Sequence, residues 1–209
     1  FNKHVRQSVP GYEKMQEYVM GISDFFVLGG SAIYDIGCST AETIAMLNTR
    51  HKDKKIRLIG VDESPDMVAK AIEFTRDMKN VQIVHDSIQN YLFKEQSNFI
   101  LSILTLQFCP IAQRKEIIQK IYDALNQGGA FVIVEKVTAS SAMHQEIFTQ
   151  LYHDLKETNG LTPLEIRQKD KALRGSLVPL NSESNLHLLT QVGFQVDVFL
   201  KNLTLLVYW

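Results

Sequence analysis

Short apolar segments alternate with longer amphipathic segments along most of the chain. The apolar segments are nearly continuous in hydrophobic residues, each ends at a glycine or a polar residue, and they span residues 31–36, 56–61, 81–84, 98–106 and 130–134. Continuous apolar residues, in contrast to alternating ones, are typical of strands buried on both faces of a parallel sheet. The pattern therefore predicts parallel strands at the centre of the fold.

The amphipathic segments between these strands carry apolar residues at helical spacing. Residues 41–49 and 111–125 predict helices, and Ser64-Pro65 supplies an N-cap and a first-turn proline for a helix that reaches about residue 78. The Asn-Gln-Gly-Gly segment at 126–129 is expected to stop the third helix and turn the chain into the next strand. Strands that alternate with helices predict a doubly wound α/β sheet.

Two segments lie outside this alternation. An N-terminal helix is expected over 8–26, with a break at Pro10-Gly11, and a long amphipathic helix is expected over 141–158. Irregular chain is expected from there to Pro179. We expect residues 1–28 to form a helical cap and residues 137–180 to form a lid, and both to contribute to an acceptor pocket at the open end of the sheet.

The C-terminal segment predicts the remaining strands. A helix over 182–192 is stopped by Gly193, and the apolar runs 194–200 and 203–208 are separated by a hairpin-type turn at Lys201-Asn202, so one of these runs is expected to be antiparallel. The expected fold is a single domain over residues 1–209 with a mostly parallel, seven-stranded, Rossmann-like sheet.

Composition narrows the class of protein. The chain has 209 residues, 45% of them hydrophobic and 22% charged, and a formal net charge of −1, which argues against a dedicated nucleic-acid binder. Its two cysteines are far apart, and its histidines show no metal-ligand spacing. No apolar run approaches the ~18 residues of a membrane span. These features predict a cytoplasmic protein with neither a metal site nor a membrane segment.

The segment from Tyr34 to Ala41 carries the most chemical information. Gly37 lets the backbone approach a ligand closely, and the helix that follows offers free N–H groups. The dinucleotide pattern GxGxxG is absent, because Ser39 and Glu42 occupy its second and third glycine positions. Asp35, just before the turn, would repel a phosphate and attract an ammonium group.

Two further acidic residues end the next two predicted strands. Asp62 stands where a carboxylate can accept hydrogen bonds from ribose hydroxyls, and Asp86, beside Ser87, stands where it can accept from an adenine amino group. Each feature alone is more often a turn or a helix cap. In combination they indicate a nucleoside with a cationic amino-acid tail and no phosphate, which describes S-adenosylmethionine (SAM) or S-adenosylhomocysteine.

The sequence resembles the class I SAM-dependent methyltransferases, and within them the carboxy-SAM synthases, which serve tRNA wobble-uridine modification. The similarity covers nearly the whole chain and is most specific in its Ser-Val-Pro-Gly-Tyr and Thr-Leu-Gln-Phe pieces. The shared motifs lie at residues 6–12, 34–39, 105–108, 125–130, 135–136, 153–156, 159–160, 164–166 and 168–169. The resemblance implies the methyltransferase fold and a homodimer.

The resemblance also implies a set of cofactor contacts. The matching positions are the N-terminal tyrosine, the glycine turn, the ribose-binding acid with its neighbour, and the adenine-side acid with its neighbour: Tyr12, Gly37, Cys38, Ser39, Asp62, Glu63, Asp86 and Ser87. Asp35, deduced above from its charge, completes the expected cofactor site together with the residue at the end of the fourth strand. That residue is Ile103, where the family has an asparagine.

A second departure concerns the reaction itself. The family's arginine that holds the extra carboxylate falls on Asp170. A carboxylated ligand needs a cation there, and a dry aspartate would repel it. A shifted loop could bring a substitute from among the nearby cations, Arg167, Lys169, Lys171 and Arg174.

The resulting expectation is a SAM-dependent methyltransferase that acts on an unidentified small-molecule acceptor. Tyr152 and His153, on the expected lid helix, are candidates for catalytic residues. One alternative is a carboxy-SAM synthase that uses prephenate as the carboxyl donor, as the resemblance implies. The other is a SAM-binding protein without catalytic activity.

Overall fold

Seven strands form one sheet in the order β3-β2-β1-β4-β5-β7-β6. The computed structural model describes residues 2–209. Its strands are β1 (Ala32–Ile36), β2 (Arg57–Asp62), β3 (Val81–His85), β4 (Ser97–Ile103), β5 (Leu125–Lys136), β6 (Val198–Asn202) and β7 (Leu205–Tyr208). The first five run parallel, and β7 lies antiparallel between β5 and β6. The expected mostly parallel, seven-stranded α/β sheet is confirmed.

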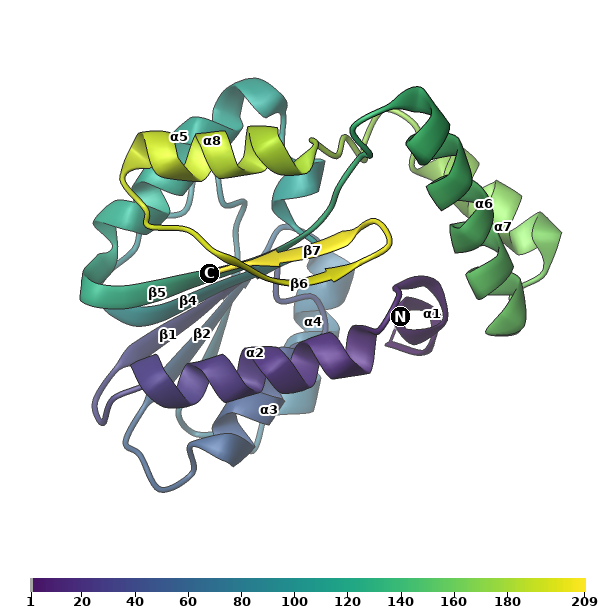
Figure 1. The fold of residues 1–209 in the computed structure, drawn as a ribbon. Coiled ribbons are helices and arrows are strands. Elements are labelled where there is room, and N and C mark those ends of the chain that lie inside the picture. The colour runs from purple at the N-terminus through teal and green to yellow at the C-terminus, as the bar shows by residue number, and fades with distance from the viewer. Residues whose placement is uncertain (1) are drawn as a thin grey trace.

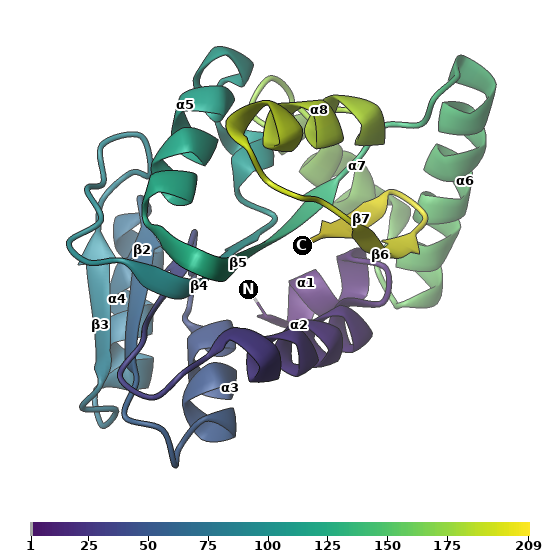
Figure 2. The same cartoon turned by 60° about the vertical axis from the view of Figure 1, so that its left-hand side comes forward.

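Helices cover both faces of the sheet and extend beyond its end (Figures 1 and 2). They are α1 (Asn2–Ser8), α2 (Tyr12–Phe26), α3 (Glu42–Arg50), α4 (Pro65–Thr75), α5 (Ile111–Asp123), α6 (Ala142–Thr158), α7 (Pro163–Ala172), α8 (Ser182–Val192) and a short 3-10 helix, η1 (Leu106–Phe108). None of the helices in the described residues is both long and apolar enough to cross a lipid bilayer.

The core consists of two layers, one on each face of the sheet. On one face, Met15 and Val19 of α2 and Ile44 of α3 pack against the sheet; on the other, Ile117 of α5 and Leu189 of α8 do so. All residues of β1 are buried, as expected for a strand covered on both faces. This burial explains why the central strands show nearly continuous apolar sequence.

Figure 1 shows α6 and α7 packed side by side at the end of the molecule where α1 lies. The irregular chain expected between residue 159 and Pro179 in fact contains α7. Thr162 and Glu165 form a reciprocal capping box at its start, and Pro163 occupies its first turn. Both devices stabilise a helix start, so the local sequence favours a helix here despite its weak apolar periodicity.

The N-terminal helix expected over 8–26 begins only at Tyr12, as α2, and a further helix that was not expected, α1, precedes it. They are separated by residues 9–11, where Gly11 adopts φ 64°. This left-handed conformation suits glycine and ends the helical path, so the break at Pro10-Gly11 changes the direction of the chain.

Two expected turns differ in the structure. The C-terminal hairpin turns at Leu203 and Thr204 rather than at Lys201-Asn202, and Leu203 adopts φ 49°. The segment 126–129 belongs to β5, where pairing with β4 jumps from Ser97–Leu125 to Phe99–Ala130. The glycines there provide a bulge within the strand rather than a turn before it.

Candidate active site

A cavity of about 920 Å³ lies at the carboxyl ends of the parallel strands. Its walls come from the segments that follow β1, β2, β3 and β4, from the end of β5, and from α1, α2, α6 and α7. This is the edge at which open α/β sheets bind their ligands. The described residues include no group of His, Cys, Asp and Glu side chains placed to hold a metal ion.

The turn after β1 is packed tightly against the loop after β4. Gly37 adopts φ 76°, and the backbone N–H groups of Gly37 and Cys38 donate to the carbonyl of Val61 at 2.7 and 3.1 Å. A Cβ on Gly37 would lie 2.0 Å from Oγ1 of Thr105. Both the backbone angle and the lack of space therefore require glycine at this position.

The carboxylate of Asp62 joins the glycine turn to the start of α4. Its Oδ2 accepts from the backbone N–H of Ser39 at 2.8 Å, and its Oδ1 accepts from that of Ser64 at 2.9 Å. Ser39 adopts φ 50°, a conformation uncommon for residues other than glycine. Asp62 also lines the cavity, and each carboxylate oxygen has a further lone pair with which to accept from a ligand hydroxyl.

Asp35 places a buried carboxyl group at the wall of the cavity. The residue is 3% exposed and lines the cavity. Burial, and next the negative charge of Asp62, raise the pKa of Asp35 to about 7. A cation beside this group would favour its charged form, so this part of the cavity suits a positively charged ligand.

Most of the expected cofactor-binding residues meet in this cavity: Tyr12, Asp35, Gly37, Cys38, Ser39, Asp62, Glu63, Asp86 and Ile103. Tyr12 accepts a hydrogen bond at its hydroxyl from Gln16 at 2.9 Å. Ser87 is not among the lining residues; its backbone N–H donates to Asp86 at 2.8 Å. Burial raises the pKa of the Cys38 thiol well above its usual range, so this residue contributes packing and backbone groups.

Positive charge gathers where the end of β5 and α6 border the cavity. Lys136, at the end of β5, and Lys156, on α6, both lie over the ring of Tyr152, with Nζ 4.9 and 4.1 Å from the ring centroid. Burial, and next the charge of Asp170, raise the pKa of Tyr152 to about 12. The sequence alone indicated no role for these two lysines, although they belong to the shared motifs at residues 135–136 and 153–156.

Asp170 does not present an unpaired charge to the cavity. Its Oδ1 lies 3.5 Å from Nζ of Lys156, and its Oδ2 lies 3.3 Å from Nε2 of His153. Tyr152 lines the cavity, whereas His153 does not and faces Asp170 instead. Of the two catalytic candidates, only Tyr152 therefore borders the cavity, and His153 is a partner of Asp170.

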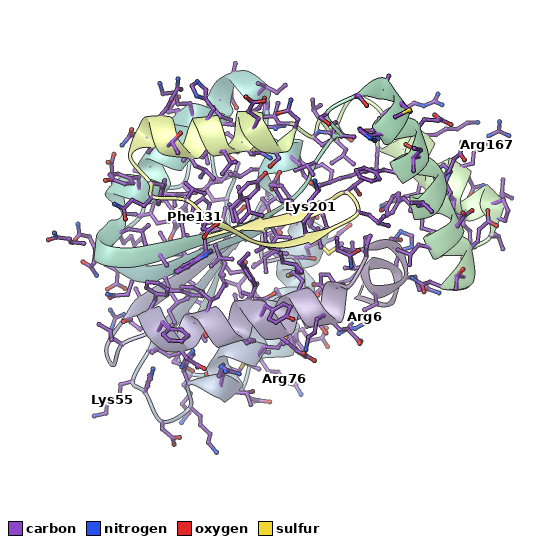
Figure 3. All side chains as sticks on the ribbon, in the orientation of Figure 1. Arg6, Lys55, Arg76, Phe131, Arg167 and Lys201 are labelled. Carbon is purple, nitrogen blue, oxygen red and sulfur yellow. The ribbon has the colours of Figure 1, made fainter. Side chains whose placement is uncertain are left out.

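Only some of the cations considered as substitutes for the missing arginine border the cavity. Lys169 and Arg174 line the cavity, and Arg167 and Lys171 do not. Figure 3 shows Arg167 extending outward from α7.

Glu135 lies behind the cavity wall, next to Lys136 in sequence. It is fully buried, and this burial raises its pKa to about 8 although the charge of Arg114 opposes the shift. It interacts with backbone groups of residues 105–107, the segment that includes η1. The side chain of Gln107 in turn accepts from the backbone N–H of Lys136 at 2.8 Å. These contacts connect the end of β5 to the loop after β4.

The chain is similar in sequence to a known domain family and to named enzymes. A family model described as a methyltransferase domain matches residues 33–129. The carboxy-S-adenosyl-L-methionine synthase of Staphylococcus epidermidis is 39% identical over 202 residues, which cover 96% of this chain and 87% of that protein. The synthase of the same name from Methylococcus capsulatus is 35% identical over 205 residues, covering 96% of this chain and 85% of that protein.

Solved structures share the fold at low sequence identity. The SAM-dependent methyltransferase SibL in its apo form has a TM-score of 0.66 at 15% identity, covering 94% of this chain and 54% of that one. The cyclopropane synthase MmaA2 from Mycobacterium tuberculosis has a TM-score of 0.65 at 13% identity, covering 88% and 62%. The shared fold and the extended sequence similarity together show that this chain is a SAM-dependent transferase of the carboxy-S-adenosyl-L-methionine synthase family.

Proposed function

We propose that this chain transfers a carboxyl group to SAM and so makes carboxy-SAM. The observation that supports this most strongly is the division of charge in one cavity. Asp35, Asp62 and Asp86 line one part, and Lys136 and Lys156 line another. Such a cavity suits a cationic cofactor and an anionic second substrate at the same time.

The acidic part of the cavity fits SAM. Asp35 complements the positive charge of its amino-acid tail or its sulfonium, Asp62 accepts from ribose hydroxyls, and Asp86 accepts from the adenine amino group. Tyr12, the turn from Gly37 to Ser39, Glu63 and Ile103 complete this contact set. When bound, SAM supplies the activated methyl carbon, and these residues hold and orient it.

The basic part of the cavity fits a carboxylate donor such as prephenate. Overall, SAM and prephenate would give carboxy-SAM, phenylpyruvate and water. The expectation of plain methyl transfer rested on repulsion from Asp170. The contacts of Asp170 with Lys156 and His153 reduce that repulsion, because a paired carboxylate projects little net charge into the cavity.

Methyl transfer to an anionic small molecule is the second candidate. It is favoured by Ile103, an apolar residue in the cavity wall where the resembling family has an asparagine. It is also favoured by the lack of a guanidinium at position 170. Transfer of a methyl group requires mainly alignment and exclusion of water, which this cavity offers as well.

Mass spectrometry of the ligand released from denatured protein separates the two candidates. The protein is produced in a host without a carboxy-SAM synthase and incubated with SAM, with and without prephenate. A SAM species heavier by one carboxyl group, formed only with prephenate, is the expected result. Recovery of SAM or S-adenosylhomocysteine alone contradicts the proposal and favours methyl transfer.

Two segments of the chain border the cavity outside the sheet. We propose that residues 1–28 and 137–180 act as its cap and lid; the lining residues Val5, Ser8 and Leu173 support this. We also propose a cytoplasmic homodimer that does not bind nucleic acid directly. Sedimentation or light scattering of the purified protein tests the dimer.

A further inference from the structure

The ammonium group of Lys136 lacks a polar partner. Within the described residues it makes no hydrogen bond or ion pair, and its Nζ lies 4.9 Å from the centroid of the Tyr152 ring. Burial and next the nearby charge of Lys156 lower its pKa, and the charge of Asp170 acts in the opposite direction without making an ion pair with it. A half-buried ammonium at a cavity wall is costly without an anion, and an anion bound there would offset both effects.

Lys156, in contrast, has an anionic partner. It is 4% exposed, and its Nζ lies 3.5 Å from Asp170. Its charge is therefore compensated, and among Lys136, Lys156 and Asp170 one positive charge remains without a partner. That charge belongs to Lys136.

We propose that Lys136 binds a carboxylate in this cavity, supported by the ring of Tyr152, and that Asp170 limits the site to one carboxylate by occupying Lys156. This inference rests on the proposed function and names the groups that recognise its anionic substrate. The carboxylate belongs either to the donor or to the carboxylated product.

The position of Lys136 is compatible with this role. It ends β5, and its backbone N–H donates to Gln107 of the loop after β4 at 2.8 Å. Loops after β4 and β1 meet where Thr105 packs on Gly37. The side chain of Lys136 therefore starts from a strand end that is hydrogen-bonded to the neighbouring loop, whereas the position that lacks the arginine lies on α7. A site on a strand end holds a ligand group more firmly than one on a helix of the proposed lid.

Calorimetric titration tests the proposal without requiring turnover. Wild type, Lys136→Met, Lys136→Arg and the control Lys115→Met, an exposed lysine on α5 outside the cavity, are titrated with SAM and with carboxy-SAM. After saturation with S-adenosylhomocysteine, which has no methyl group to react, they are also titrated with prephenate. We expect Lys136→Met to weaken binding of prephenate or carboxy-SAM by about 10-fold or more, as for loss of a charged hydrogen bond. Binding of SAM should be unchanged in every variant. Lys136→Arg should keep much of the affinity for prephenate or carboxy-SAM that Lys136→Met loses.

The two carboxylate ligands identify the source of the carboxylate. A loss confined to prephenate assigns the site to the donor, and a loss confined to carboxy-SAM assigns it to the product. Equal affinities of wild type and Lys136→Met for both ligands overturn the proposal, as does a wild type that binds neither. If carboxylate binding depends on Lys136 but no carboxy-SAM forms, the proposed function fails and this inference stands.

Asp170→Asn provides a test in the opposite direction. The amide removes the charge that compensates Lys156, so a second ammonium becomes available to the carboxylate. We expect binding of the same ligand to become roughly 3-fold tighter or more, as for one additional partly exposed ion pair. Weaker binding in this variant contradicts the role given to Asp170, because it would mean that the aspartate supports the carboxylate site.

Discussion

Oδ2 of Asp62 accepts a hydrogen bond from the backbone N–H of Ser39 at 2.8 Å, across the gap between the ends of β2 and β1. The contact holds Ser39 at φ 50° and so fixes the shape of the glycine turn. An acidic residue expected from the sequence to accept from ribose is therefore also part of the framework that shapes the proposed cofactor site. Its replacement should affect both binding and folding.

We expect Asp62→Ala to weaken SAM binding by about 1–3 kcal/mol through loss of charged hydrogen bonds, and to lower the free energy of unfolding as well. The backbone N–H groups of Ser39 and Ser64 lose their acceptor in this variant. Calorimetry measures the first effect and denaturant unfolding the second. Asp53→Ala, at an exposed loop position, is the control. An unchanged SAM affinity would remove Asp62 from the cofactor site.

Gly37→Ala should abolish SAM binding and destabilise the protein by more than the cost of the backbone angle alone. The added Cβ would lie 2.0 Å from Thr105 at a backbone φ of +76°. Gly128→Ala is a matched control, because Gly128 has a similar φ of +78° but no atom within 4 Å of the place where the added Cβ would lie. That control should cost about 1–2 kcal/mol, the strain of a left-handed conformation. Equal destabilisation of the two variants would show that the contact with Thr105 is unimportant.

SAM affinity should increase as the pH rises from about 6 to 8. The pKa of Asp35 is raised to about 7, so below that pH the carboxyl group is mostly neutral and attracts a cation less. Binding of SAM favours the charged form and releases a proton. Titrations in buffers of different ionisation enthalpy measure this release. Asp35→Asn should remove the pH dependence, and a wild-type affinity that is constant over this range contradicts the assignment.

Stability of the protein without ligand should contain a contribution that decreases with rising pH. Burial raises the pKa of Glu135 to about 8, so the folded state retains a proton that the unfolded state releases above its ordinary pKa. This contribution is largest at low pH and is lost at roughly 1.4 kcal/mol per unit between about pH 5 and 8. Unfolding of wild type and Glu135→Gln across this range isolates it. A difference between them that does not vary with pH would contradict the prediction.

The acidic part of the cavity could largely be predicted from the sequence. Buried parallel strands need nearly continuous apolar sequence, and their ends converge at one edge, so Asp35, Asp62 and Asp86 could be placed together before the structure was known. The start of α7 was also encoded locally, in the Thr162–Glu165 capping box, but weak apolar periodicity concealed it.

The sequence by itself thus determined the sheet, the glycine turn and the acidic part of the cavity, because each depends on local residue types and on a topology that βαβ units impose. Only the tertiary structure decided the basic part. Lys136, Tyr152 and Asp170 lie on three different elements, and whether the aspartate opposes a carboxylate depends on its distance from Lys156 and His153. Charge acts through space, and the distances that govern it are set by how α6 and α7 pack.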